Sequence, residues 1–216
     1  MRKQVLVTGF DPFGGEPVNP ALEAVKMLQA KTFDQATVVT REIPTVFHKS
    51  IEVLSQAIEE VMPDIVICVG QAGGRSDVTI ERIAINVDDA PISDNEGNLP
   101  MDEPIIPDGP AAYWSSLPIK ATVQRMREAG IPVSVSQTAG TFVCNHLFYG
   151  LAHLIATKFP ELRGGFIHIP YLPEQAVRHP GQPSMSVESV VRALEIAIQT
   201  AVEVDIDSVV LDGKVS

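Results

Sequence analysis

The sequence has little cysteine, little positive charge and no long apolar run. Two cysteines in 216 residues are too few for the disulfide framework of a small secreted domain. Lysine and arginine number 16 against 27 aspartate and glutamate, and the net charge of −11 argues against nucleic acid or membrane as a partner. No apolar run approaches the roughly 20 residues of a membrane span, and no signal peptide is evident. These absences predict a cytoplasmic protein.

Apolar β-branched runs alternate with segments of helical period along the whole chain. Strands are predicted over 4–10, 36–42, 64–70, 132–137 and 164–170, and helices over 19–30, 49–62, 118–130, 144–159 and 186–204. No linker interrupts this alternation, which predicts an α/β layered fold with a mostly parallel sheet in one domain, residues 1–216.

Three segments fall outside the strand and helix alternation. Residues 76–110 start with the extended run TIERIAINV and continue into a polar excursion rich in proline, aspartate and glycine. Residues 170–186 form a second proline-rich connection, and residues 211–216 are expected to be frayed.

Cys144 lies in GTFVCNH, between the turn after a predicted strand and the start of a predicted helix. Unpaired N–H groups and the dipole at a helix start lower the pKa of a thiol. In open α/β sheets the carboxyl edge, where such turns lie, is where sites form. A small buried hydrophobe remains an equal alternative, because cysteine is readily buried.

One of the five histidines stands out as a partner for this thiol. His146 is two residues beyond Cys144, so the two do not share a helix face. The other three are interpreted as solvated or surface residues: His48, His153 and His179. His168 ends the strand GGFIHIP on the face of Phe166, at the carboxyl edge, and is therefore the candidate base.

Glu81 is the candidate third group. In TIERIAINV it alternates onto the face of Ile83 and Ile85, where a carboxylate is costly unless paired. It either forms an ion pair at a strand end or accepts the imidazole N–H of His168 and stabilises the imidazolium.

Two glycine-rich loops, GFDPFGG over 9–15 and GQAGGR over 70–75, follow predicted strands. Neither matches a dinucleotide or P-loop pattern, and the single Cys–His cluster has no second cluster with metal-ligand spacing, so no cofactor and no metal are expected. Phe10 and Phe13 on the first loop, with Phe142 and Val143 before the cysteine, are predicted to line a small apolar pocket beside the thiol.

Five blocks, TGFDPFGG, VGQAGGR, ERIAIN, SQTAGTFVCNH and GGFIHIPYLPEQ, together resemble the pyroglutamyl peptidase I (pyrrolidone-carboxylate peptidase) family across nearly the whole chain. The resemblance implies a cytoplasmic cysteine exopeptidase with an α/β/α sandwich, often a homotetramer, that cleaves after N-terminal pyroglutamate of peptides and proteins through a thioester. It implies Cys144 as nucleophile, His168 as base and acid, and Glu81 as the orienting group.

The resemblance also implies a pocket for the lactam ring. Its walls would be Phe10, Phe13, Thr45, Ile92, Phe142 and Val143, with Gln71 beside the ring. One departure concerns residues 90–95, APISDN, where the family usually has ARIPDN, so that Pro91 replaces an arginine and Ser93 a proline. Turnover or leaving-group preference is expected to differ accordingly.

Two other functions remain as alternatives. A phosphorylase-like enzyme would need a cluster of cations at the glycine loops, where only Arg75 is present. A ligand-binding protein that has lost turnover would keep the pocket but not an activated thiol.

Overall fold

Six strands form the main sheet of the computed structural model, in the order β2-β1-β3-β8-β4-β7. They are β1 (Lys3–Phe10), β2 (Ala36–Ile43), β3 (Ile65–Gln71), β4 (Val78–Glu81), β7 (Val133–Ser136) and β8 (Arg163–Ile169). The structure describes residues 2–209, so the tail 211–216 lies outside the described residues. All neighbouring pairs are parallel except β4 and β8, which confirms the mostly parallel sheet.

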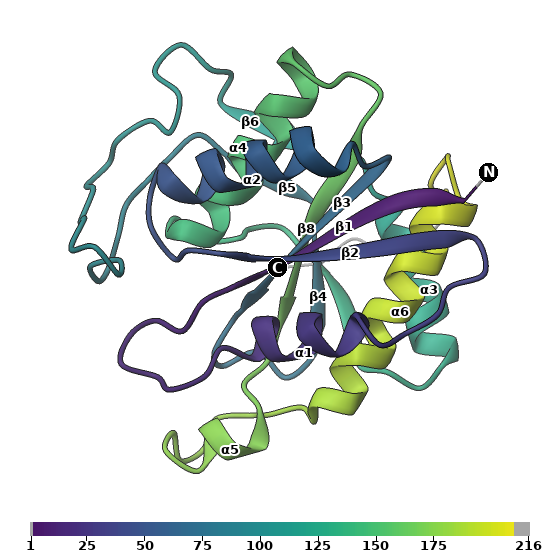
Figure 1. Ribbon diagram of the computed structural model, residues 1–216. Helices are drawn as coiled ribbons and strands as arrows, with labels where there is room; N and C mark the ends of the chain where they lie inside the picture. The colour runs from purple at the N-terminus through teal and green to yellow at the C-terminus, as the bar shows by residue number, and fades with distance from the viewer. Residues whose placement is uncertain (1, 210–216) are drawn as a thin grey trace.

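Helices cover both faces of the sheet (Figure 1). On one face lie α2 (Lys49–Val61) and α4 (Val143–Thr157). On the other lie α1 (Pro20–Leu28), α3 (Ile119–Glu128) and α6 (Val187–Glu203). The predicted helices are therefore confirmed to within a few residues of their ends, and the layers follow the α/β/α order.

Strand alternation decides which side chains meet which helices. On β8, Ile167 and Ile169 enter the hydrophobic core under α1 and α6, while Phe166 enters the core under α4. Two residues on from Phe166, His168 shares its face, as the alternation predicts. At the start of α1 the Asn19 side chain caps the helix by accepting the Ala21 N–H at 3.0 Å.

The run TIERIAINV is not one extended segment. After β4 the chain leaves the main sheet at Arg82, and β5 (Ile83–Ile85) pairs with β6 (Ala112–Trp114) in a separate two-stranded sheet. The amide side chain of Asn145 on α4 holds β5 there, because it bonds both the N–H and the C=O of Ile85, at 3.1 and 2.9 Å. Alternation alone could not show this change of sheet.

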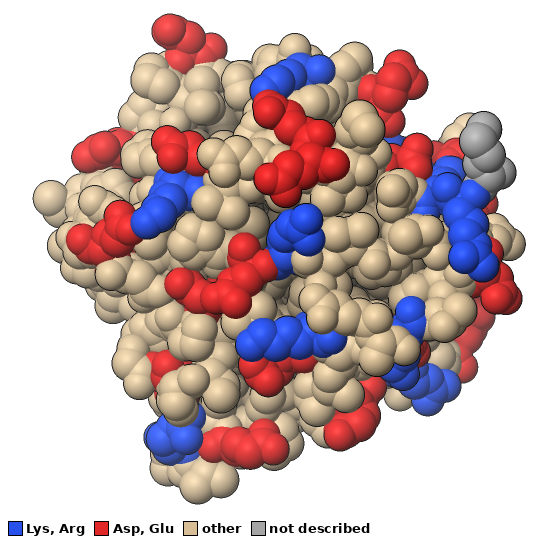
Figure 2. Space-filling view, in the orientation of Figure 1, with Lys and Arg blue, Asp and Glu red and all other residues tan. Residues whose placement is uncertain are grey.

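The two predicted connections differ in regularity. Residues 86–111 form an irregular excursion beside α2 and α4, whereas the second connection contains the short helix α5 (Pro173–Ala176), which the sequence analysis did not predict (Figure 1). Within residues 2–209, no helix has the length and apolar character needed to cross a bilayer. Acidic and basic side chains intermingle on the face in Figure 2, with no continuous basic area there.

Candidate active site

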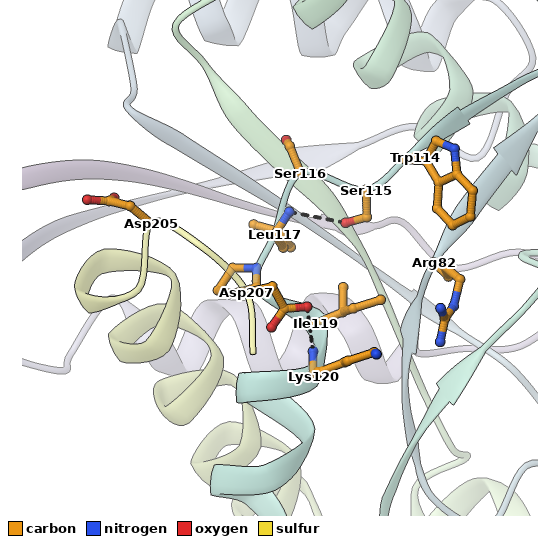
Figure 3. A pocket seen from close by; sticks show the side chains of 10 residues that line it. Arg82, Trp114, Ser115, Ser116, Leu117, Ile119, Lys120, Asp205 and Asp207 are labelled. Atoms are coloured by element: carbon orange, nitrogen blue, oxygen red, sulfur yellow. Dashed lines mark hydrogen bonds between the residues drawn. The ribbon is translucent and has the colours of Figure 1, made fainter. Parts of the chain in front are cut away.

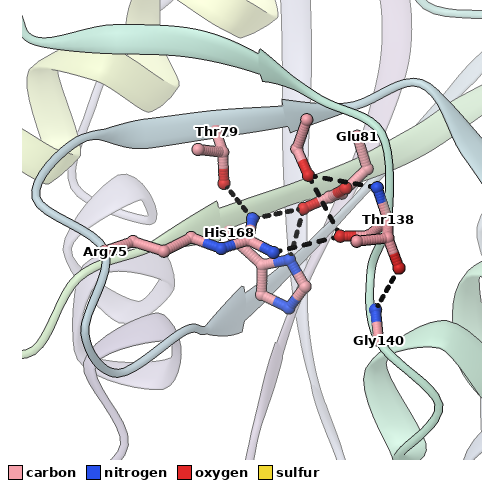
Figure 4. A network of polar contacts seen from close by, with 7 residues as sticks. Arg75, Thr79, Glu81, Thr138, Gly140 and His168 are labelled. Carbon is pink, nitrogen blue, oxygen red and sulfur yellow. Dashed lines mark hydrogen bonds and ion pairs between the residues drawn. The ribbon is translucent and has the colours of Figure 1, made fainter. Parts of the chain in front are cut away.

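A buried carboxylate and a buried imidazole form the polar centre of the site (Figure 4). His168 lies near the end of β8 and Glu81 ends β4, and the two residues are 3% and 0% exposed. The Nδ1 atom of His168 is 2.7 Å from Oε1 of Glu81. With Nδ1–H donating to the carboxylate, the lone pair of Nε2 is left to accept a proton.

Cys144 approaches the same place from the helix layer. It is the second residue of α4, whose N-cap, Phe142, makes no side-chain capping bond. A Cβ atom added to Gly70 would lie 2.9 Å from Cys144 Sγ and 2.8 Å from Cζ of Phe166. Gly70 is the ladder partner of His168 on the adjacent strand. The thiol therefore sits over Gly70, next to the strand position that carries the imidazole.

The route by which these groups meet differs from the predicted one. The sequence analysis placed Cys144 and His168 at one shared carboxyl edge. However, β4 and β8 are antiparallel while β4 and β7 are parallel, so β7 and β8 end at opposite edges. The prediction that both preceding strands end at one edge was wrong, but the loop after β7 returns Cys144 to the carboxyl end of β3, beside His168. The strands are short enough that Glu81 still reaches His168 diagonally, and residues 137–142 lead back to Gly70.

The surroundings of the Cys144 thiol and of the His168 imidazole on balance disfavour the charged form of each group. Burial and the Glu81 carboxylate raise the pKa of Cys144 to about 12, although Arg75 opposes them. The residue is partly exposed, but its sulfur lies among core side chains, so desolvation outweighs the helix start. Burial also lowers the pKa of His168, against the hydrogen bond and charge of Glu81.

The expected lowering of the thiol pKa was therefore wrong for the unliganded protein. Glu81 stays ionised: burial acts to raise its pKa, but the bond and charge of His168, with bonds from Ser136 and Arg75, lower it. A neutral imidazole beside a neutral thiol can accept its proton as the sulfur attacks.

Arg75 is a site residue that the sequence analysis did not assign. Its Nη1 atom lies 2.6 Å from Oε1 of Glu81, the oxygen that also bonds His168. The available indication was a single cation in a glycine-rich loop before a candidate catalytic strand. That signal was considered only for phosphate binding, and the structure instead directs the guanidinium to a carboxylate.

Aromatic rings gather beside the thiol. The Phe142 ring lies 6.1 Å from that of Phe13 and 5.4 Å from that of Phe47, between ring centroids. Phe10 and Val143 are buried in the core under α4, where the Phe10 ring lies 6.3 Å from that of Phe166, between ring centroids. Phe47 was not among the predicted residues, and its place in a helix-preceding turn gave no indication of this contact.

The remaining predicted pocket residues lie on three separate segments of the chain. The buried Thr45 donates its N–H to Oδ1 of Asp11 at 2.6 Å. Gln71 ends β3 and its side-chain oxygen accepts from Gln175 at 3.0 Å. Ile92 is exposed on the excursion, beside the exposed Pro91. The side chains of Asp11 and Gln175 bond Thr45 and Gln71. The sequence analysis did not identify them, because these partners are distant in sequence.

His146 is committed to a structural contact. It is fully buried, its Nδ1 atom lies 2.7 Å from Asp88, and its Nε2 atom accepts the N–H of His48 at 2.8 Å. Both ring nitrogens are occupied, which agrees with its rejection as the base. His153 is not simply solvated, because its Nδ1 atom bonds the Tyr113 hydroxyl at 2.9 Å.

A separate cavity of about 280 Å³ lies away from this site (Figure 3). Arg82, Trp114 and Asp207 are among the side chains that line it. The Asp207 carboxylate accepts the backbone N–H groups of Lys120 and Ala121, each at 3.0 Å, and so caps α3. This carboxylate therefore has a structural role.

A thiol, an imidazole and a buried carboxylate close together are the groups that a cysteine hydrolase uses. The family model described as "Pyroglutamyl peptidase" matches residues 3–204, and the chain belongs to this family. The pyrrolidone-carboxylate peptidase of Bacillus mycoides is 59% identical over 211 residues, 98% of each chain.

Solved structures agree with this assignment. The pyroglutamyl peptidase I of Bacillus amyloliquefaciens superposes with a TM-score of 0.94 at 55% identity, over 96% of this chain and 99% of that one. A mutant pyrrolidone carboxyl peptidase of Pyrococcus furiosus gives 0.89 at 47% identity, over 93% and 98%.

Proposed function

We propose that Cys144 is the nucleophile, His168 the general base and acid, and Glu81 the group that orients the imidazole. The chain is a cysteine-type exopeptidase that removes N-terminal pyroglutamate, and peptides carrying that group are its substrates. The observation that carries the residue assignment is the Cys144 sulfur over Gly70, the ladder partner of His168, whose Nδ1 atom bonds Glu81.

Acylation begins from neutral groups. As the Cys144 sulfur attacks the carbonyl carbon that joins the lactam ring to the next residue, its proton passes to Nε2 of His168. The imidazolium, stabilised by Glu81, then gives this proton to the leaving amine nitrogen. The carbon–nitrogen bond breaks, the shortened peptide departs, and pyroglutamate remains on the sulfur as a thioester.

Deacylation repeats these transfers with water. His168 takes a proton from the water as the oxygen attacks the thioester carbon. The carbon–sulfur bond then breaks, the imidazolium returns the proton to the sulfur, and free pyroglutamate leaves. In both stages negative charge develops on the carbonyl oxygen. The start of α4 supports a role in holding it, because its N-cap residue, Phe142, makes no side-chain capping bond. The first N–H groups of a helix, which here include that of Cys144, have no partner within the helix.

The pocket suits a neutral lactam. Pyroglutamate has no charged amine, so the ring can enter a wall of Phe13 and Phe142 without desolvating a charge. Free glutamate or glutamine would bring a charged amine against the same apolar rings, and the cost of desolvating that charge disfavours them. We propose that Thr45, Ile92, Phe10 and Val143 complete this wall and that Gln71 bonds the ring amide.

The direct test is Cys144→Ala, with Cys68→Ala as the matched control. Cys68 is the other free cysteine and is buried in β3. Hydrolysis of a fluorogenic pyroglutamyl amide is expected to fall by more than about a thousandfold in Cys144→Ala and to persist in Cys68→Ala. Thermal unfolding checks that both variants fold. Retained turnover in Cys144→Ala would refute the nucleophile assignment.

We also propose that residues 1–216 form one catalytic domain that assembles as a cytoplasmic homotetramer. Exposed apolar side chains support self-association: Met62, Met101 and Trp114 are 78%, 72% and 69% exposed. Light scattering after size exclusion should give the tetramer mass, and a monomer at micromolar concentration would refute it. Fractionation of the source cells tests the compartment.

A further inference from the structure

The guanidinium of Arg75 joins the Glu81 strand to the loop that leads to Cys144 (Figure 4). Arg75 lies between β3 and β4, and its side chain is 27% exposed. Nη1 donates to Oε1 of Glu81 at 2.6 Å and also to the Thr79 hydroxyl. Nη2 donates to the Thr138 carbonyl oxygen at 3.0 Å. One planar group thus fixes three acceptors on two segments.

The first consequence concerns the orientation of Glu81. Its Oε1 atom accepts from Arg75 and from Nδ1 of His168, at 2.6 and 2.7 Å. Two charge-assisted donors on one oxygen hold the carboxylate against rotation, and a guanidinium does so better than an ammonium because its donors form a rigid fork. The alignment of the imidazole therefore depends on Arg75 through Glu81.

The second consequence concerns the loop before Cys144. Thr138 begins the turn that connects β7 to α4, and its hydroxyl accepts the Gly140 N–H at 3.0 Å. Gly140 has φ of 79°, so the turn depends on a backbone conformation that favours glycine. By holding the Thr138 carbonyl, Arg75 ties this turn to the strand that carries the carboxylate.

The charge of Arg75 acts on the same groups. The charged and titratable side chains that influence His168 are Glu81 from β4 and Arg75 from the loop before it, with the Cys144 thiol facing it from α4. Burial has the largest effect on the pKa of His168 and lowers it, Glu81 raises it, and Arg75 lowers it. Arg75 also acts to lower the pKa of Cys144, against burial and Glu81, which raise it. Its loss would leave the Glu81 charge uncompensated.

We propose that Arg75 is a positioning residue of the peptidase: it holds Glu81 against His168 and couples that pair to the turn that presents Cys144. This proposal rests on the catalytic roles proposed above. The side-chain hydrogen bonds of Arg75 go to Thr79, Glu81 and Thr138. Loss of the Arg75 side chain should therefore lower kcat and shift the pH profile while leaving KM nearly unchanged. A residue that only stabilises the fold would not produce this combination.

The test compares Arg75→Gln, Arg75→Lys and the control Arg163→Gln. Arg163 is a good match, because its side chain is 19% exposed and it donates to the carbonyls of Ala201 and Val204 at the other end of β8. Steady-state hydrolysis of a pyroglutamyl amide is measured across pH, with thermal unfolding of every variant.

In Arg75→Gln, kcat should fall roughly 10- to 100-fold, and the acid limb of kcat/KM should move to higher pH. Arg75→Lys keeps the charge but not the fork, so its acid limb should stay near that of the wild type while kcat still falls. Arg163→Gln should lose stability without either change.

An unmoved acid limb or a wild-type kcat in folded Arg75→Gln would overturn the proposal. If that variant does not fold, Arg75→Lys decides: a wild-type kcat would overturn the proposal, and a reduced kcat with unchanged KM would support it. Cys144→Ala separates this result from the catalytic assignment. If Cys144→Ala is inactive and the Arg75 variants behave as wild type, only the role of Arg75 fails.

Discussion

Gly70→Ala is a minimal change at the place where the Cys144 thiol meets the sheet, beside His168. Gly70 lies next to the end of β3 and pairs with His168. The added methyl carbon would meet Cys144 Sγ at 2.9 Å and Cζ of Phe166 at 2.8 Å. Ordinary contacts between such atoms are about 3.5–4.0 Å, so the sulfur, the ring or both must move by roughly 0.6–1.2 Å.

The displacement has a structural and a catalytic cost. Overpacking a close-packed core costs about 1–3 kcal/mol. For a chain of this size each kcal/mol lowers Tm by about 2–4 °C. A reacting atom misplaced by about an ångström can lose roughly 100-fold in rate. We therefore expect Gly70→Ala to remain folded while kcat falls by about two orders of magnitude.

Gly164→Ala is the matched control on β8, away from the site. Its methyl carbon would meet a Leu151 side-chain carbon and the Val66 carbonyl oxygen, both at 3.0 Å, so it should also reduce stability. Hydrolysis of a pyroglutamyl amide and thermal unfolding are measured for both variants. The reasoning fails if Gly70→Ala keeps the wild-type kcat, or if Gly164→Ala with an equal loss of Tm loses as much activity.

Two further predictions concern ionisation. In Glu81→Gln the imidazole loses its anionic partner, so kcat should fall by roughly 100-fold or more. The acid limb of kcat/KM should move to lower pH, which is the opposite direction to that in Arg75→Gln. Wild-type kinetics in Glu81→Gln would leave Glu81 with a structural role only. Burial raises the pKa of Cys144 to about 12, so this thiol should carry no charge at neutral pH. Wild type and Cys144→Ala should therefore have the same ultraviolet thiolate absorbance at neutral pH and differ only in strong base. A full thiolate signal at neutral pH would contradict this account.

Local patterns were sufficient for the elements and for the chemical types at the site. The period of the apolar residues placed α4 and β8 almost at their observed ends, and strand alternation put His168 on the face of Phe166. These are properties of consecutive residues, because side-chain direction repeats every two residues in a strand and about every 3.6 in a helix. Cys144 and His168 could therefore be selected without coordinates, whereas the alternation used to select Glu81 is interrupted where the chain changes sheet at Arg82.

Strand direction, sheet membership and long-range polar partners were decided only by the tertiary structure. Alternation specifies a face but not the neighbouring strand or its direction, so it could not show that β7 and β8 end at opposite edges. It also could not show that the chain changes sheet after Arg82. The bonds of Arg75 to Glu81 and Thr138 depend on how separate segments pack, and packing is a property of the whole chain.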